Sequence, residues 1–433
     1  MARPCGTTKL AKAILIAAPH SGSGKTLITL GLLRALKNRG LKVVSAKVGP
    51  DYIDARFHEA ASGAPCINLD YWAMGPEACK ARLNAHAAGA DLVAIEGVMG
   101  LFDGPDGAKG STADLAEALG LPIVLVIDAA KQAQSVAAVV HGFSTYRSAL
   151  KIAGVILNRV GSDRHARMLS DSLDSTILGL MRQNDSAVWP SRHLGLVQAQ
   201  ENQYLEAFIE SAASGVSRET FVDKLIESAI EFTNHPFKNT NPLPPLAQTI
   251  AIASDVAFAF AYPHLLQDWR DQGAELRFFS PLANETPNGE AIFLPGGYPE
   301  LHAGQLAANK TFLSAMRQHE GLIYGECGGY MVLGNALVDK DGTAHVMAGL
   351  LPLTTSFATR KLHLGYRQLK PLNAPWKSPL RGHEFHFSTI QSQSGGEPLF
   401  HATDAAGTDI GPIGQRVGQV MGSYAHIISQ APA

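Results

Sequence analysis

Two short glycine-rich segments hold residue types that could carry chemistry. Residues 21–26 read SGSGKT, and residues 325–329 read GECGG. The first segment is typical of a loop that binds nucleotide phosphates, and the second of a tight turn that presents a cysteine nucleophile. Together they predict one reaction, in which ATP activates an acceptor at one site and an amide donor releases nitrogen at the other.

The first segment has the composition of a P-loop. Such a loop needs backbone N–H groups that point inward, supplied here by Ser23 and Gly24, at the start of a helix that favours anions. Lys25 would meet the β and γ phosphates of ATP, and the hydroxyl of Thr26 would bind Mg²⁺. Pro19 departs from the usual pattern, which begins with glycine. The alternative is a Gly/Ser turn that precedes a lysine by chance.

Four acidic residues lie in two further loops. Asp51 and Asp54 belong to KVGPDYID, and Glu96 and Asp103 belong to EGVMGLFDG. Ligands of open parallel sheets bind beyond the carboxyl ends of the strands, so we expect these loops to converge with the phosphate loop. Carboxylates there can hold Mg²⁺ and orient an acceptor. The alternative for Asp51 and Asp54 is that they form turns and cap the next helix.

The cysteine of the second segment, Cys327, follows an apolar run and precedes a predicted helix. Its thiol is little ionised at neutral pH, because the ordinary pKa is about 8.5, so a base should help. His426 is the best candidate for that base. Gly296 and Gly297, in LPGGYPE, would present backbone N–H groups as an oxyanion hole. The alternative is that Cys327 is only a small buried residue between glycines.

Length and composition limit the class of protein. A chain of 433 residues is too long for one compact core, so two domains are expected. A net charge of −2 implies no broad field for nucleic acid or an acidic membrane. No apolar run approaches the roughly 20 residues that span a bilayer. The four cysteines have no zinc-like spacing, which fits a reducing, cytoplasmic location.

Short apolar runs alternate with helical patterns over the first 200 residues, which predicts a doubly wound, mostly parallel α/β domain with a P-loop. Helices are expected at Lys25–Asn38 and Ala113–Leu119. The expected strands are Ala13–Ala18, Leu41–Ala46, Leu92–Glu96, Pro122–Asp128 and Ile152–Asn158.

A proline-rich segment, 236–248, predicts a stiff linker between an ATP-binding domain at 1–235 and a second α/β domain at 249–433. The order of the strands in the last hundred residues is not evident. Strands of the second domain are expected at Thr249–Ala253, Glu275–Phe279, Ala291–Leu294, Leu322–Tyr324, Leu362–Leu369 and Glu384–Gln391.

These motifs resemble a known family. SGSGKT, KVGPDYID, EGVMGLFDG, LPGGYPE, YGECGGY and GHEFHFS occur in the order seen in cobyrinic and hydrogenobyrinic acid a,c-diamide synthases. The similarity covers nearly the whole chain. The family resembles dethiobiotin synthetase in its ATP domain and class I glutamine amidotransferases in its second domain.

The resemblance implies a ligase of cobalamin biosynthesis that uses ATP, Mg²⁺ and glutamine. ATP would phosphorylate the a and c acetate side chains of hydrogenobyrinic or cobyrinic acid. Cys327 would release ammonia from glutamine, and ammonia would displace the phosphate. The metal-free acceptor is favoured slightly, and a homodimer is a further expectation.

The resemblance also implies roles for single residues. Lys25 and Thr26 would bind ATP phosphates and Mg²⁺, and the four acids named above would bind metal or orient the acceptor. Asn158 lies where dethiobiotin-synthetase-like proteins contact adenine. Class I amidotransferases place a glutamate two residues after the catalytic histidine, where this chain has Ile428. Either a Cys–His dyad suffices, or another acid such as Glu384 orients the imidazole.

Other hypotheses stay open at this point. His383 and His386 of GHEFHFS either serve the cysteine site or only line it. Cobyric acid synthase joins similar domains but amidates other side chains of the corrin. A partitioning-type P-loop ATPase is an alternative from another class, although its loop usually has an extra lysine near the position of Ser21, and it has no use for a cysteine turn.

Overall fold

The computed structural model describes residues 11–183, 204–216, 219–232 and 241–432. The chain divides into two compact units, one made of Met1–Gly104 and Lys109–Asn239, the other of Pro105–Ala108 and Thr240–Ala433. Residues 236–240 of the predicted linker lie outside the described residues. The domain limits therefore stay a prediction.

A central parallel sheet organises the first unit. Its strands lie in the order β3-β2-β4-β1-β5-β6-β7, and the short β8 (Ile230–Glu231) pairs with β1 in the antiparallel direction. The strands are β1 (Lys12–Ala17), β2 (Val43–Val48), β3 (Cys66–Leu69), β4 (Leu92–Glu96), β5 (Pro122–Asp128), β6 (Lys151–Val160) and β7 (Ile177–Arg182). Most residues of these strands are buried, and every residue of β4 is, as a sheet covered on both faces requires.

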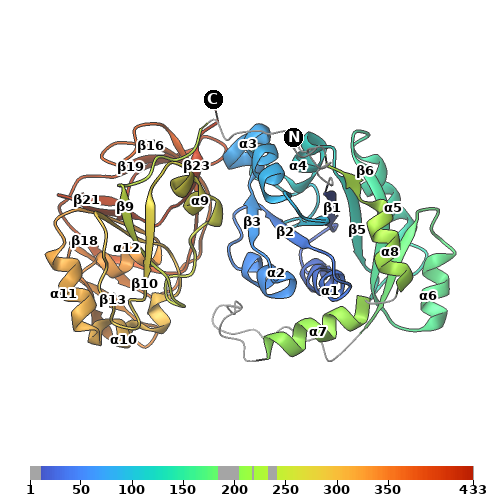
Figure 1. Cartoon of the computed structure of the whole chain (residues 1–433), viewed down its shortest axis with the longest axis horizontal. Coiled ribbons are helices and arrows are strands. Elements are labelled where there is room, and N and C mark those ends of the chain that lie inside the picture. The colour runs from blue at the N-terminus through green and yellow to red at the C-terminus, as the bar shows by residue number, and fades with distance from the viewer. Residues whose placement is uncertain (1–10, 184–203, 217–218, 233–240, 433) are drawn as a thin grey trace, which may run out of the picture. The chain divides into compact units, whose positions relative to one another are not determined.

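Helices cover both faces of this sheet, with α1, α2 and α7 on one side and α3 and α4 on the other (Figure 1). Helix α1 packs so closely on α7 that a Cβ atom on Gly31 would lie 2.6 Å from the carbonyl oxygen of Ala212. The helices are α1 (Lys25–Asn38), α2 (Asp54–Ser62), α3 (Tyr71–His86), α4 (Thr112–Leu119), α5 (Val136–Thr145), α6 (Asp163–Ser170), α7 (Leu205–Val216) and α8 (Glu219–Ser228). The predicted doubly wound α/β class is confirmed.

The second unit has a second, mostly parallel sheet in the order β10-β9-β11-β12-β22-β21. These strands are β9 (Thr249–Ala253), β10 (Glu275–Phe279), β11 (Ala291–Leu294), β12 (Leu322–Glu326), β21 (Gln415–Val417) and β22 (Val420–Ser423). The helices of this unit are α9 (Pro263–Asp271), α10 (Ala303–Ala308), α11 (Lys310–Gln318) and α12 (Gly328–Leu333), with the 3-10 turn η3 (Pro299–Leu301). The predicted α/β character of this part is confirmed.

Two smaller sheets complete the second unit. One has the order β14-β13-β15-β18, and the other has the order β20-β19-β16-β17-β23. Their strands are β13 (Ala336–Val338), β14 (Ala344–Val346), β15 (Leu353–Ser356), β16 (His363–Pro371), β17 (Leu380–His386), β18 (Thr389–Gln393), β19 (Phe400–Thr403), β20 (Asp409–Ile413) and β23 (His426–Gln430).

The strand expected at Glu384–Gln391 was wrong. The chain leaves one sheet at the end of β17 and enters another at β18. The two residues between them are held separately, because the carbonyl of Phe387 accepts from the Lys361 amide and the hydroxyl of Ser388 donates to that of Tyr424. An apolar-polar pattern cannot show such a break.

The described part of the proline-rich segment, 241–248, is fixed to the second unit. Main-chain oxygens of Pro242, Leu243 and Pro244 accept hydrogen bonds from the side chains of Gln430, Gln272 and Trp376, at 2.7, 2.9 and 2.8 Å. Proline favours this, because it fixes an extended backbone whose carbonyls stay available.

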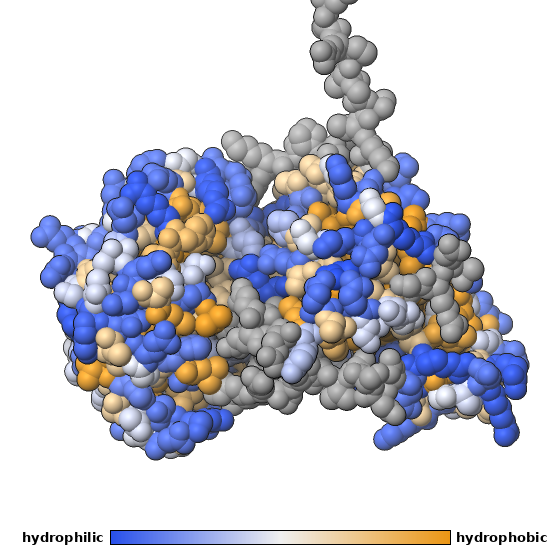
Figure 2. All heavy atoms as spheres, turned by 60° about the horizontal axis from the view of Figure 1, so that its bottom comes forward, coloured by the Kyte–Doolittle hydropathy of each residue, from blue (hydrophilic) through white to orange (hydrophobic). Residues whose placement is uncertain are grey.

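The surface shown in Figure 2 is mainly hydrophilic. Figure 2 shows one face of the molecule, where hydrophilic residues predominate and apolar patches lie between them. Among the described residues, no helix is both long enough and apolar enough to cross a membrane.

Candidate active site

Three loops of the first unit meet at one edge of the sheet. Strands β2, β4 and β1 are neighbours and parallel, so their carboxyl ends lie together. The phosphate loop follows β1, KVGPDYID begins in β2, and EGVMGLFDG begins at the last residue of β4. The sheet order therefore confirms the expected convergence of the three loops.

The phosphate loop is held from outside by Asn158. Gly24, with φ of 92°, precedes α1, and its neighbour Ser23 accepts a hydrogen bond of 2.9 Å from Nδ2 of Asn158 at its main-chain oxygen. A Cβ atom on Gly24 would lie 2.2 Å from that Nδ2. Oδ1 of Asn158 accepts from the Arg159 amide. Both polar groups of Asn158 thus hold backbone, and its contact with adenine stays a prediction.

Lys25 links two of the three loops. Its ammonium donates a hydrogen bond of 2.6 Å to the main-chain oxygen of Met99, in EGVMGLFDG. Burial lowers the pKa of Lys25, and the nearby Glu96, Asp54 and Asp103 oppose that shift. Lys25 is the first residue of α1, so its ammonium lies where it can meet a phosphate.

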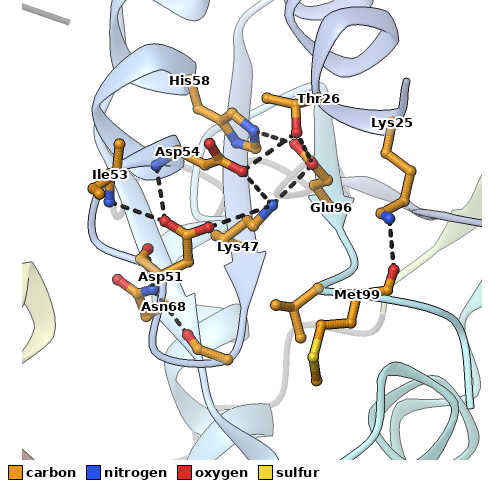
Figure 3. Close-up of polar contacts among 12 residues, drawn as sticks. Lys25, Thr26, Lys47, Asp51, Ile53, Asp54, His58, Asn68, Glu96 and Met99 are labelled. Carbon is orange, nitrogen blue, oxygen red and sulfur yellow. Dashed lines mark hydrogen bonds and ion pairs between the residues drawn. The ribbon is translucent and has the colours of Figure 1, made fainter. Parts of the chain in front are cut away.

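Thr26, Asp54 and Glu96 come together around a buried lysine that the site prediction did not include. Nζ of Lys47 lies 2.7 Å from Oδ2 of Asp54 and 2.8 Å from Oε1 of Glu96. The hydroxyl of Thr26 donates to the same Oε1 at 2.7 Å and lies 3.3 Å from Oδ2 of Asp54. Figure 3 shows Lys47 reaching between the two carboxylates. Its place as the first residue of KVGPDYID was the available signal.

The charges in this cluster stabilise one another. Burial alone would raise the pKa of Glu96, but Lys47 and His58 hold it well below its usual range. Burial alone would lower the pKa of Lys47, but Asp54, Glu96 and Asp51 raise it above its usual value. The lysine and Glu96 are therefore both ionised at neutral pH.

His58 was also missed. Its Nε2 lies 2.6 Å from Oε2 of Glu96, and its Nδ1 lies 3.6 Å from Sγ of Cys66. Burial would lower the pKa of His58, but Cys66 and Glu96 raise it to about 10. His58 lies within α2 and belongs to no motif, so only the packing of α2 on β2, the neighbour of β4, identifies it.

Asp51 makes the contacts expected of a residue that forms a turn and caps the next helix, which was the alternative to ligand binding. Its Oδ1 accepts from the amides of Ile53 and Asp54, at 3.0 and 2.9 Å, and so caps the turn before α2. Its Oδ2 lies 3.9 Å from Nζ of Lys47. Burial and the nearby Asp54 raise the pKa of Asp51 to about 7. A role in metal or acceptor binding stays a prediction.

Asp103 stabilises its own loop. Its Oδ2 accepts a hydrogen bond of 2.9 Å from the Gly100 amide, and its side chain is exposed. A Cβ atom on Gly100 would lie 2.5 Å from that oxygen, so glycine is required for this contact. A role for Asp103 toward a ligand stays a prediction.

A cavity of about 1000 Å³ opens beside the phosphate loop. Its walls come from the loop, the start of α1, the ends of β6 and β7, and α7. The volume is in the range of small-molecule sites. Lining residues include Gly24, Lys25, Thr26, Asp54, Asn158, Arg159, Met181, Arg182, Phe208 and Ser211.

In the second unit, Cys327 lies on a strained turn between β12 and α12. Its φ is 46° and its ψ is −104°, outside the regions that L-residues favour. Its amide donates a hydrogen bond of 2.8 Å to the main-chain oxygen of Ser423. The neighbouring glycines have no space for side chains, since a Cβ atom on Gly329 would lie 2.0 Å from the oxygen of Leu294. This is the geometry expected of a nucleophile turn.

His426 begins β23 and is fully buried. Gly296 packs against its ring, and a Cβ atom on Gly296 would lie 2.2 Å from Cε1 of His426. A Cβ atom on Gly328, next to Cys327, would lie 3.1 Å from the amide nitrogen of Gly297. The predicted oxyanion segment is therefore next to both the imidazole and the cysteine turn, while its role toward substrate stays a prediction.

The thiol and the imidazole are both neutral at rest. Burial and the nearby Glu300 raise the pKa of Cys327 above its usual value. Burial, with His383 and His386, lowers the pKa of His426 to about 3. A proton must therefore move from sulfur to nitrogen during the reaction for a thiolate to form.

The histidines of GHEFHFS are neutral and packed. Burial lowers the pKa of His383 to about 4 and that of His386 to about 3. The ring of His386 stacks on Tyr424 with centroids 3.7 Å apart, and on His363 with centroids 4.7 Å apart. His383 lies opposite His426 in the pairing of β17 with β23. These contacts are those of residues that line and hold the cysteine site.

The acid proposed to orient His426 has another partner. Nε and Nη2 of Arg367 donate to Oε2 of Glu384, at 3.0 and 2.7 Å. A different carboxylate faces the imidazole, because Oε2 of Glu326 lies 4.0 Å from Nδ1 of His426. Sequence reasoning missed Glu326, although it directly precedes Cys327.

Fold and site define a two-part enzyme, in which a nucleotide-binding unit is joined to a glutamine amidotransferase unit. Residues 14–197 match the family model of the CobQ/CobB/MinD/ParA nucleotide binding domain, and residues 249–433 match that of the CobB/CobQ-like glutamine amidotransferase domain.

Curated relatives extend the match to the whole chain. A hydrogenobyrinate a,c-diamide synthase from Sinorhizobium sp is 50% identical over 97% of this chain and 99% of its own length. Proteins of the same name from Rhizobium meliloti and Mesorhizobium japonicum are 51% and 45% identical, over 96% and 98% of this chain and 98% and 100% of their own lengths. The chain belongs to the hydrogenobyrinate a,c-diamide synthase family, and the resemblance seen in its motifs is confirmed.

Proposed function

We propose that this chain converts the a and c acetate side chains of hydrogenobyrinic acid into amides, with ATP and glutamine as co-substrates. The observation that supports the proposal is that each unit of the chain holds a candidate catalytic centre. One is the Lys25, Thr26 and Glu96 cluster at the phosphate loop, and the other is Cys327 with His426. The full-length relatives named hydrogenobyrinate a,c-diamide synthase support the choice of acceptor.

The first centre would activate the acceptor. A carboxylate is a poor electrophile with no usable leaving group, and phosphorylation by ATP corrects both faults. Lys25, at the start of α1, would bind the transferred phosphoryl group and stabilise its charge. Lys47 stays ionised between Asp54 and Glu96 and would offset negative charge as the acetate oxygen approaches the γ-phosphate. The products of this step are an acyl phosphate and ADP.

The oxygen ligands of this centre fit Mg²⁺. The hydroxyl of Thr26 and the carboxylates of Asp54 and Glu96 lie within hydrogen-bond distance of one another or of Lys47. Mg²⁺ takes one or two carboxylates together with substrate phosphates and water. When bound there, Mg²⁺ would neutralise charge on the phosphates of ATP. Thr26 and Glu96 would hold it, and Asp51, Asp54 and Asp103 would position it or the acceptor.

The second centre would supply ammonia. His426 would take the proton of Cys327, and the thiolate would attack the carboxamide carbon of glutamine, with the amides of Gly296 and Gly297 stabilising the oxyanion. The C–N bond would break, His426 would return the proton to the leaving nitrogen, and water would hydrolyse the thioester to glutamate. Ammonia formed in a closed site arrives unprotonated, attacks the acyl phosphate and displaces phosphate.

Mass spectrometry of the corrinoid tests the proposal. The enzyme is incubated with ATP, Mg²⁺, glutamine and either hydrogenobyrinic or cobyrinic acid. We expect two successive mass decreases with hydrogenobyrinic acid, each equal to the replacement of a hydroxyl by an amino group. Amidation of more than two side chains would point to the cobyric acid synthase type. ATP hydrolysis without any amidation would point to a partitioning-type ATPase.

Further features follow from the same proposal. Residues 1–235 would form the synthetase domain, 236–248 the linker and 249–433 the amidotransferase domain. A reducing, cytoplasmic location would keep the thiol of Cys327 available. A homodimer is the assembly to test by light scattering.

A further inference from the structure

The carboxylate of Glu326 is buried next to the imidazole of His426. Its Oε2 lies 4.0 Å from Nδ1, and both side chains are almost entirely excluded from solvent. Its other oxygen, Oε1, accepts a hydrogen bond of 3.1 Å from the Ile427 amide. Glu326 is thus fixed to the residue that follows His426, and it is fixed through the main chain.

The sheet explains why these residues meet. Glu326 ends β12, and β12 pairs with β22 so that Glu326 lies opposite Ser423. Only two residues separate Ser423 from His426, where β23 begins. A residue next to the nucleophile in sequence therefore reaches the histidine through the neighbouring strand.

The other two positions considered for an acid do not serve. Ile428, two residues after the histidine, carries no carboxylate, and its main-chain oxygen accepts from Nε2 of His264 at 2.8 Å. Glu384 is held by two hydrogen bonds from Arg367.

We propose that Glu326 is the positioning residue of the glutaminase centre, which holds His426 with Nδ1 protonated and stabilises the imidazolium that forms when Cys327 loses its proton. The inference rests on the proposed role of Cys327 as the nucleophile. The carboxylate stabilises His426 most when the imidazolium forms, as in other catalytic triads. The resting distance of 4.0 Å is longer than a hydrogen bond, and such contacts commonly tighten when substrate binds.

The protonation state of Glu326 supports a visible pH dependence. Burial raises the pKa of Glu326 to about 8, so its carboxylate forms as the pH rises through that value. The imidazole of His426 has a pKa of about 3 and does not titrate in this range. Glutaminase activity should therefore increase with pH through about 8. The other groups that face this pair are Tyr324 on β12, Cys327 on the turn, and His383 and His386 on β17, and the imidazole also makes a hydrogen bond with the main chain of Phe260.

The test compares Glu326→Gln with Glu384→Gln in glutamine hydrolysis between pH 6 and 9.5. The amide oxygen of the new glutamine can still accept from the Ile427 amide, so the substitution removes charge and little else. We expect kcat to fall by about 10²- to 10⁴-fold in Glu326→Gln, with KM changed far less and with the inflection near pH 8 absent. Glu326→Asp should recover part of the rate. Glu384→Gln should keep the inflection.

Two results would overturn the inference. One is a folded Glu326→Gln enzyme with the kcat and pH profile of the unaltered protein, and the other is loss of the inflection in Glu384→Gln alone. Circular dichroism and urea unfolding show whether the unit that carries the substitution is folded. Should Glu326→Gln not fold, nitrogen NMR of the unaltered enzyme decides, because the inference requires the proton of neutral His426 on Nδ1 above pH 8, and a proton on Nε2 contradicts it.

The same assays separate this inference from the proposed function. Glutamine hydrolysis that survives in Cys327→Ala would show that Cys327 is not the nucleophile. Both the proposed function and the role of Glu326 would then fail. Hydrolysis lost in Cys327→Ala but normal in Glu326→Gln would overturn only the role of Glu326.

Discussion

The ammonium of Lys47 lies 2.8 Å from Oε1 of Glu96, and both side chains are buried at the carboxyl edge of the sheet. The same carboxylate oxygen accepts from the hydroxyl of Thr26, which directly follows the phosphate-loop lysine. A buried charge without a partner is costly, so the ion pair holds KVGPDYID to EGVMGLFDG. The hydrogen bond from Thr26 joins both loops to the phosphate loop.

We expect Lys47→Gln to lose amidation with either glutamine or ammonium as nitrogen source. Loss of the ammonium leaves Glu96 and Asp54 close together with less compensation, which should lower the free energy of unfolding by about 3 kcal/mol. Lys42→Gln, which changes an exposed lysine directly before β2, is the matched control. Urea unfolding and corrinoid mass spectrometry check the two effects. Full amidation by Lys47→Gln would contradict the role given to this lysine.

The pair of His58 and Glu96 predicts a loss of stability at high pH. The pKa of His58 is raised from 6.5 to about 10 in the folded protein, so folded chains retain a proton that unfolded chains lose. Its contribution to stability is complete below about pH 6.5 and disappears as the pH rises to about 10. His58→Gln should flatten this part of the stability curve. An equal slope in both proteins, measured by urea unfolding at several pH values, would show that His58 does not titrate as described.

Gly24→Ala should raise the KM for ATP by tenfold or more, because the new Cβ atom would collide with Asn158, which supports the loop. Gly22→Ala is the matched control. Gly22 also has a positive φ, of 81°, but a Cβ atom there would meet nothing within 4 Å. Its cost should be only the roughly 1–2 kcal/mol of left-handed backbone strain. Similar KM values in the two variants would mean that Asn158 does not support nucleotide binding.

Gly296→Ala should damage the glutaminase centre alone. Its Cβ atom would lie 2.2 Å from Cε1 of His426, so the ring must move. We expect glutamine-dependent amidation to fall by at least 10²-fold while ammonium-dependent amidation persists. Gly304→Ala, in α10, is the control, since the nearest atom to its Cβ is 3.7 Å away. Normal glutamine use by Gly296→Ala would show that the ring of His426 need not be held there.

Much of the fold could be predicted from the sequence, because buried parallel strands are short apolar runs bounded by turns. The bounds of α1, β4, β5, β9, β10 and β11 agree with prediction to the residue. Strand β3 was missed, because Asn68 interrupts its short apolar run, whereas the equally short β11 is apolar throughout. The break between β17 and β18 depends on contacts with Lys361 and Tyr424 that no local pattern contains.

Some residues of the candidate sites could also be predicted from the sequence, and others could not. Residues within motifs, such as Lys25, Glu96 and Cys327, could be named from the sequence. His58 lies in no motif, and Glu326 lies within GECGG but shows its contact with His426 only in the structure. His58 meets Glu96 because α2 packs on β2, which pairs with β4, and Glu326 meets His426 because β12 pairs with β22.

The central claim is that nitrogen release and acceptor activation occur at separate centres. Cys327→Ala, supplied with ATP, Mg²⁺ and hydrogenobyrinic acid, tests it most directly when glutamine and ammonium salt are compared as nitrogen sources. The account predicts no amide from glutamine and the full diamide from ammonium, whereas Lys25→Ala should form little amide from either. A folded Cys327→Ala enzyme that fails with ammonium as well, or one that still uses glutamine, would contradict the account.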